Sequence, residues 1–123
     1  MEKFFCPICG NQLIEEFAIG DICSCCGNES CVDDDILSNE LAKFNDEDFL
    51  IAGCNKSELK KLTRMPFEVA HRLLRAKWIN DGCKWVFNSR NEKPNDWSLE
   101  KAKQQLSNIN EDIDNYINGI INY

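Results

Sequence analysis

The sequence Cys-Pro-Ile-Cys-Gly at residues 6–10 has a counterpart, Cys-Ser-Cys-Cys-Gly, at residues 23–27. Two residues between cysteines allow a tight turn to direct both sulfurs to one point, and the glycine permits the positive φ on which such a turn ends. Four thiolates gathered in this way suit a tetrahedral zinc ion, about 2.3 Å from each sulfur. The spacing therefore predicts a structural zinc site. Its predicted ligands are Cys6, Cys9, Cys23 and Cys26.

The same cysteines are compatible with other uses. Disulfides need an oxidising compartment, a redox Cys-x-x-Cys is typical of a βαβ setting, and iron accepts the same four thiolates as zinc. Cys25 lies inside the second motif and is an alternative ligand, although the spacing favours Cys26. The first two alternatives concern whether the cysteines bind a metal, and the last two concern which metal and which ligands.

Composition restricts the classes of protein to which this chain can belong. The 123 residues carry a net charge of −7, which argues against direct nucleic-acid binding through clustered basic residues. No export signal is visible before Cys6, and no apolar run is long enough to span a membrane. We therefore expect a cytoplasmic protein, in whose reducing environment paired cysteines bind metal.

The pattern along the chain predicts an α+β protein, with a small zinc ribbon over residues 1–35 packed on a mainly helical region over residues 36–123. Residues 10–22 alternate turn residues with short apolar stretches, which suits a β-hairpin between the two cysteine motifs. The acidic run Asp33, Asp34 and Asp35 marks the boundary, where it could cap the next helix.

Helical periodicity follows the boundary. It predicts a short helix over residues 36–44, a second one capped by Ser57, and a third one between Pro66 and Gly82, where Arg75 is expected to face solvent. Ser98 should cap a long C-terminal helix. Its apolar residues recur in two heptad series that form one stripe, expected to pack internally: Leu99, Leu106, Ile113 and Ile120, with Ala102, Ile109 and Tyr116.

With these motifs in place, the chain resembles a group of small bacterial cysteine-rich zinc-ribbon proteins. The resemblance rests on the two cysteine motifs, on Leu-Arg-Ala-Lys-Trp-Ile-Asn-Asp-Gly at residues 74–82, and on Lys-Pro-Asn-Asp-Trp at residues 93–97. Residues 28–31 depart from the group's pattern, which has an aromatic residue and a glycine there. Proteins of this group often look like members of toxin–immunity gene sets, which implies a role in immunity.

The resulting functional hypothesis is an immunity protein that neutralises a basic toxin domain by binding it. The alternative is a zinc-ribbon adaptor in a cellular complex. An enzyme is not expected, because four cysteine ligands leave no open metal position for water. The acidic side chains predicted to contact a basic partner are Asp33, Asp34, Asp35, Asp46, Glu47 and Asp48.

Overall fold

The computed structural model describes residues 3–13, 19–88 and 91–116. It contains a two-stranded antiparallel sheet, β1 (Phe4–Phe5) and β2 (Gln12–Leu13), followed by helices. The helical elements are η1 (Ser38–Lys43), α1 (Asp46–Ala52), α2 (Lys56–Leu59), α3 (Phe67–Asn80), α4 (Leu99–Leu106) and η2 (Ser107–Ile109), of which η1 and η2 are 3₁₀ helices. The expected α+β class is confirmed.

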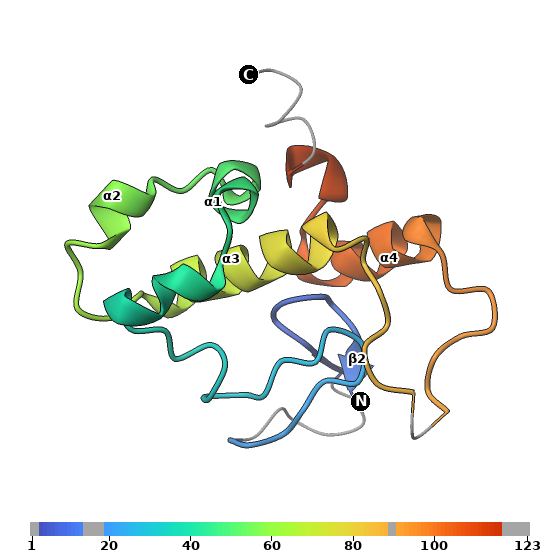
Figure 1. Ribbon diagram of the computed structural model, residues 1–123. Coiled ribbons are helices and arrows are strands. Elements are labelled where there is room, and N and C mark those ends of the chain that lie inside the picture. Colours follow the sequence, from blue (N-terminus) through green and yellow to red (C-terminus); the bar gives the residue numbers. More distant parts are fainter. Residues whose placement is uncertain (1–2, 14–18, 89–90, 117–123) are drawn as a thin grey trace.

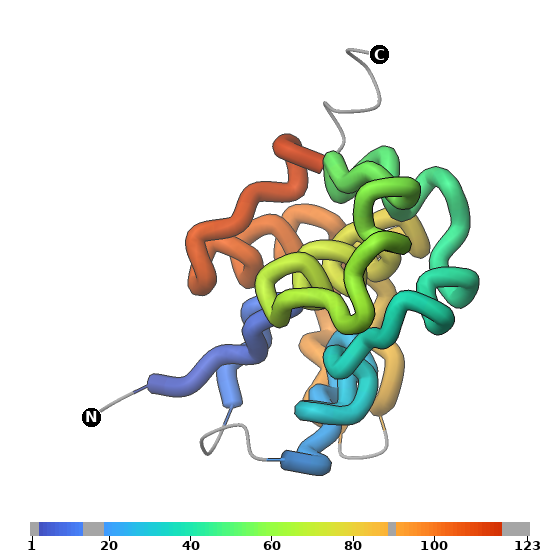
Figure 2. The backbone as a smooth tube through the Cα atoms, turned by 90° about the vertical axis from the view of Figure 1, so that its left-hand side faces the viewer, coloured from blue at the N-terminus to red at the C-terminus, as the bar shows by residue number. Residues whose placement is uncertain are grey.

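Helix α3 is the central element of the fold (Figure 1). Helix α1 packs on it, α4 lies along its other side, and the cysteine-containing N-terminal part lies below it in the view of Figure 1. The same arrangement is visible after a quarter turn (Figure 2). Both predicted parts of the chain therefore meet at one helix.

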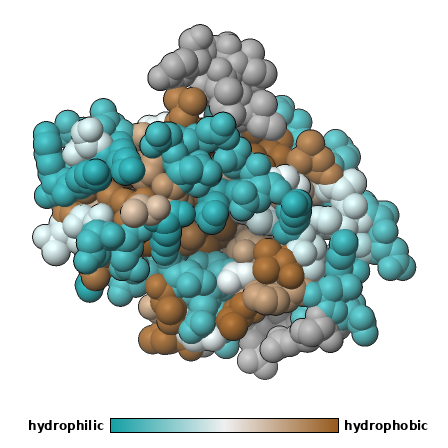
Figure 3. Space-filling view, viewed as in Figure 1, coloured by the Kyte–Doolittle hydropathy of each residue, from teal (hydrophilic) through white to brown (hydrophobic). Residues whose placement is uncertain are grey.

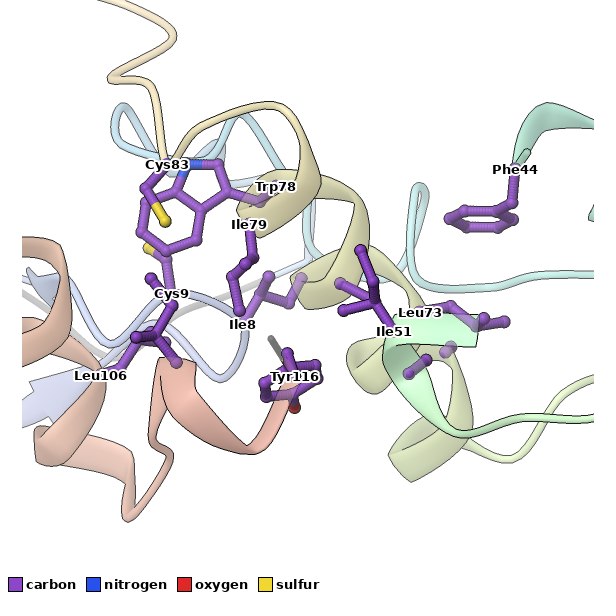
Figure 4. Close-up of a cluster of buried hydrophobic side chains, with 14 of the residues drawn as sticks. Ile8, Cys9, Phe44, Ile51, Leu73, Trp78, Ile79, Cys83, Leu106 and Tyr116 are labelled. Atoms are coloured by element: carbon purple, nitrogen blue, oxygen red, sulfur yellow. The ribbon is translucent and has the colours of Figure 1, made fainter. Parts of the chain in front are cut away.

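The hydrophobic core is continuous across these elements. It extends from Cys6, Ile8 and Cys9 through the buried face of α3 to Leu106 and Tyr116. Figure 4 shows Ile8 lying between Ile79 and Tyr116, with Leu106 next to Cys9. The N-terminal cysteine region thus shares its buried surface with the helices and does not have a core of its own.

Helix α3 begins and ends where the sequence predicts. Pro66 is its N-cap residue, and Gly82 follows its end with a φ of +96°. The N–H of Cys83 donates to the carbonyl of Trp78 (2.9 Å) and that of Gly82 to the carbonyl of Ile79 (3.0 Å), the hydrogen-bond pair of a Schellman cap. The cap turns the chain back toward the N-terminal part.

The short helix expected over residues 36–44 is present as the 3₁₀ helix η1, over the narrower range Ser38–Lys43. Two other local predictions are wrong in detail. The N-cap of α2 is Asn55, whose side chain accepts from the N–H of Glu58 (3.3 Å), and Ser57 lies inside the helix. The strands β1 and β2 flank the first cysteine motif instead of filling the space between the motifs, of which residues 14–18 lie outside the described part.

The predicted long C-terminal helix is also wrong. Helix α4 ends at Leu106, and after η2 the chain turns at Asn110, whose φ is +59°. Asparagine tolerates this left-handed conformation better than most residues, so it can end a helix as glycine does. The turn folds Ile113 and Tyr116 back onto the core, where both are buried. Ile120 lies outside the described residues.

Internal packing of the stripe leads to a stability prediction. Leu106 is fully buried, whereas Leu99, on the same helix, is 55% exposed, so the expectation of internal packing is wrong for Leu99. We expect Leu106→Ala to cost about 2–5 kcal/mol of unfolding free energy, and Leu99→Ala to change it by less than about 0.5 kcal/mol. Urea unfolding of both variants measures the difference. Equal costs for the two substitutions would contradict internal packing of α4.

Candidate metal centre

The two cysteine motifs fold into matching turns. In the first, the N–H of Cys6 donates to the carbonyl of Asn11 (2.8 Å), and that of Gly10 donates to the carbonyl of Cys6 (3.0 Å). The second motif repeats both bonds, from Cys23 to Asn28 (2.9 Å) and from Gly27 to Cys23 (2.8 Å). Gly10 and Gly27 have φ values of +81° and +80°, so each motif uses its glycine as the sequence predicts.

The turns bring the four predicted ligand sulfurs together. The sulfurs of Cys6, Cys9, Cys23 and Cys26 all lie within 4.8 Å of one another. The Sγ–Sγ distance is 3.7 Å between Cys6 and Cys26 and 3.6 Å between Cys9 and Cys23. A tetrahedron of sulfurs about 2.3 Å from a central ion has edges of about 3.8 Å, so these separations fit a four-thiolate metal site.

The same distances speak against disulfides in this cluster. A disulfide joins two sulfurs at about 2.05 Å, well below the observed separations. All eight cysteines are free thiols in the structure. The cluster can therefore hold a metal ion, and its donor set suits zinc and iron alike.

Cys25 lies outside the group of four sulfurs despite its place inside the second motif. Its buried sulfur accepts a hydrogen bond from the side-chain amide of Gln105 in α4 (3.2 Å), and the same amide donates to the carbonyl of Cys9 (3.1 Å). Gln105 thus ties α4 to both cysteine motifs. The arrangement agrees with the spacing argument that Cys26, and not Cys25, is the fourth ligand.

Burial and crowding govern the ionisation of the cluster. Hydrogen bonds from Cys26, Cys6 and Cys9 hold the pKa of the Cys23 thiol far below its ordinary value, although burial acts in the opposite direction. Burial is the main cause that raises the pKa of Cys9 well above its ordinary value. Metal ligands of this kind must be deprotonated, so a bound cation would replace these hydrogen bonds between the sulfurs.

Polar side chains around the turns complete the site. The amide of Asn11 donates to the sulfur of Cys23 (3.8 Å), and the amide of Asn108 donates to the carbonyl of Gly10 (3.0 Å). A Cβ atom at Gly10 would overlap the carbonyl oxygen of Gln105, so the first turn fits against the end of α4 only with glycine there. Hydrogen bonds to the thiolates and their turns orient the ligands.

Arg75 of α3 fastens the first turn to the helical core. Its Nε donates to the carbonyl of Ile8 (2.7 Å) and its Nη2 to the carbonyl of Pro7 (2.6 Å). Its Nη1 donates to Glu111 (2.6 Å) and to the hydroxyl of Tyr116 (2.8 Å). The expectation that Arg75 is a solvated charge is wrong, because the side chain is 8% exposed and each of its three nitrogens donates a hydrogen bond. Periodicity gave no sign of this role, since the partners are far away in sequence.

The other cysteines take no part in the cluster. Burial raises the pKa of Cys83 to about 12, with the nearby Cys25 as a smaller cause, and burial likewise raises the pKa of Cys54. Thiols with such pKa values carry little thiolate at neutral pH and react slowly. Both cysteines act as apolar packing residues in this fold, as the sequence predicts.

The six acidic residues predicted to contact a partner differ widely in exposure. Asp46 and Glu47 are exposed, Asp33 and Asp35 are half-buried, and two are buried: Asp34 and Asp48. Asp48 forms a capping box with Asn45 at the start of α1 and accepts from the amide of Asn80 (3.1 Å). A buried carboxylate committed to such bonds is not available to a partner, so Asp48 is not part of a free acidic surface.

The run at residues 33–35 does not cap a helix. Asp33 accepts from the N–H of Glu29 (2.9 Å), and Asp34 accepts from the N–H of Cys31 (2.7 Å), so both close the turn after the second cysteine motif. Asp34 also meets Nε2 of His71 in α3 at 2.9 Å. The interpretation of this run as an exposed acidic patch is therefore wrong for Asp34, whose bonds hold the turn against α3.

Comparisons with models of known families, with curated proteins and with solved structures found no match to this chain. In the part of the chain that the structure describes, no helix is both long and apolar enough to cross a membrane.

Proposed function

We propose that the cluster binds one structural zinc ion and that the protein is a non-catalytic interaction module. The observation that carries the proposal is the closed set of four sulfurs within 4.8 Å, of which three belong to residues at most 1% exposed. Structural zinc sites use four protein ligands, whereas catalytic ones keep a position for water. His71, the chain's single histidine, is engaged by Asp34, which further disfavours a catalytic thiol–imidazole pair.

The surroundings of the cluster support the zinc-ribbon interpretation. The first motif lies between the paired strands β1 and β2, and the second lies between Ile22 and Glu29, which form an antiparallel bridge. Each pair of ligands therefore sits at the closed end of a short antiparallel pairing. Elemental analysis of purified protein tests the metal: one zinc per chain is expected, and iron or no metal would contradict this part of the proposal.

The partner that we propose is a basic toxin domain, which the protein neutralises by binding. The net charge of −7 favours a basic partner, and the resemblance to proteins of toxin–immunity gene sets suggests a toxin. Asp46 and Glu47, exposed at the start of α1, are the acidic side chains of the predicted set that remain free for contact. The experiment that tests this proposal therefore substitutes these two residues.

We expect Asp46→Lys/Glu47→Lys to reduce the association rate with the toxin encoded by a neighbouring gene, and a rise in salt to reduce it in the unchanged protein. Steering by surface charges is screened beyond about 8 Å at physiological ionic strength. Stopped-flow binding and growth protection of cells that express the toxin are the measurements. Reversal of residues 33–35 is unsuitable, because it would disrupt the turn that contains Asp34.

The matched control is Asp96→Lys/Glu100→Lys, which changes the net charge equally at exposed residues near the start of α4. It should lower the rate less than the variant at α1 if the contact is local. Equal decreases in the association rate would show that net charge, and not a local contact at α1, determines the rate. If no neighbouring gene is toxic, or if co-expression gives no protection, the immunity proposal fails and the adaptor alternative replaces it.

A further inference from the structure

A pocket of about 360 Å³ lies between the second cysteine motif, the end of η1 and the C-terminal half of α3. Its apolar wall consists of Ile8, Phe44, Leu74, Trp78 and Val86. Ligand pockets in proteins span roughly 300–1,000 Å³ and are mostly apolar with a few polar groups, so this one suits a molecule of one or two rings. Figure 3 shows the hydrophobic residues that reach the surface between hydrophilic ones on one face of the molecule.

Asn28 is the polar residue of the wall that requires an explanation. It is 5% exposed, and among the described residues neither its side-chain nitrogen nor its oxygen has a hydrogen-bond partner. Both atoms are shielded from solvent, and buried polar groups in native proteins are nearly always bonded. A rotation of this side chain toward the pocket satisfies both atoms if the occupant carries a donor and an acceptor side by side.

The rim of the pocket selects against a highly charged occupant. Lys43, Lys77 and Lys84 face Asp33 and Asp81, which leaves a formal charge of +1 from three cations and two anions. Lys77 pairs with Asp81 at 3.7 Å, and Lys43 donates to the backbone carbonyl of Asp33 (3.4 Å). A nearly neutral rim around an apolar wall favours a neutral ligand.

We propose that this pocket binds a neutral, planar heteroaromatic molecule with an adjacent donor and acceptor, the chemical class of nucleobases and their nucleosides. An asparagine amide pairs in bidentate fashion with the N6 and N7 edge of adenine. Phe44 and Trp78 line the pocket, where such a ring can pack against the parts of their side chains that the pocket reaches. This site is separate from the protein contact proposed above, because it uses neither Asp46 nor Glu47.

The test is calorimetric titration of the full-length, metal-loaded protein with adenosine and with uridine, with tryptophan fluorescence as a second readout. We expect saturable binding of one nucleoside per chain. Purine riboside, which lacks the exocyclic amine, should bind at least about tenfold more weakly than adenosine if Asn28 reads that edge. Absence of saturable binding of both nucleosides at millimolar concentrations would overturn the proposal.

Three variants locate the site. Asn28→Ala should weaken nucleoside binding at least about tenfold, while the exposed Asn39→Ala should leave it unchanged. Leu74→Trp should abolish binding by filling the pocket. Asn28→Ala should also melt at or above the temperature of the unchanged protein, because it removes two unbonded buried groups. Unchanged binding in Asn28→Ala and Leu74→Trp would place the nucleoside elsewhere and overturn the proposal.

Discussion

Cys6→Ser should remove the metal from the protein and unfold the N-terminal cysteine region. A neutral serine hydroxyl is a far poorer zinc ligand than a thiolate, and a tetrahedral site with three strong ligands binds much more weakly. Structural zinc contributes about 10–16 kcal/mol of apparent binding free energy in small zinc domains at neutral pH, so most of the local stability depends on it. Zinc content and thermal unfolding measure the effect.

The same loss is expected for Cys26→Ser, because its sulfur lies 3.7 Å from that of Cys6 inside the cluster. Cys25→Ser is the matched control, since it changes the adjacent residue of the same motif. It should keep one zinc per chain, because the Cys25 sulfur lies outside the group of four. Equal metal loss in Cys25→Ser and Cys26→Ser would show that the second motif supplies a different ligand.

The cysteine cluster is predictable from sequence because its geometry is local. Two residues between cysteines and a glycine after each pair determine the turn, and the same backbone hydrogen bonds recur in both motifs. Helix α3 is predictable for the same reason, since Pro66 and Gly82 act on the nearest turn of backbone. The sequence does not show how these pieces face one another.

Arg75, Asp34 and Asn28 illustrate that limit. Arg75 binds carbonyls more than sixty positions away, and Asp34 meets His71 across 37 positions. Arg75 was expected to be solvated, Asp34 was expected to contact a partner, and Asn28 had no expected role, because charged and amide side chains are usually exposed. Their burial follows from the packing of α3 against both cysteine motifs, a contact that no local pattern encodes.

The heptad stripe failed for a different reason. Seven-residue spacing of apolar residues is compatible with one long helix, and it is also compatible with two short helical pieces that fold back on one core. The left-handed turn at Asn110 produces the second arrangement. The burial of Ile113 and Tyr116 stabilises that turn. The stripe therefore predicted most of the buried residues correctly and the path of the chain incorrectly.

Arg75→Met should destabilise the protein by about 3–5 kcal/mol, because it leaves the partners of a buried charge unpaired. The carboxylate of Glu111 loses its ion pair at 2.6 Å, and the carbonyls of Pro7 and Ile8 lose their donors beside the first cysteine motif. Methionine keeps the apolar length of the side chain, so the loss reports the guanidinium group and not a cavity. Urea unfolding of the metal-loaded protein is the measurement.

Arg64→Met provides the comparison, because Arg64 pairs with Asp35 at 3.0 Å, and the side chains are 65% and 42% exposed to water. Such pairs contribute about 0–1 kcal/mol, so this variant should unfold almost as the unchanged protein does. In the double variant Arg75→Met/Glu111→Gln part of the loss should be recovered, since the unpaired carboxylate is removed. A cost for Arg75→Met as small as that for Arg64→Met would mean that the cysteine turn keeps its place without the arginine, and that its contacts with Gln105 and Asn108 are sufficient.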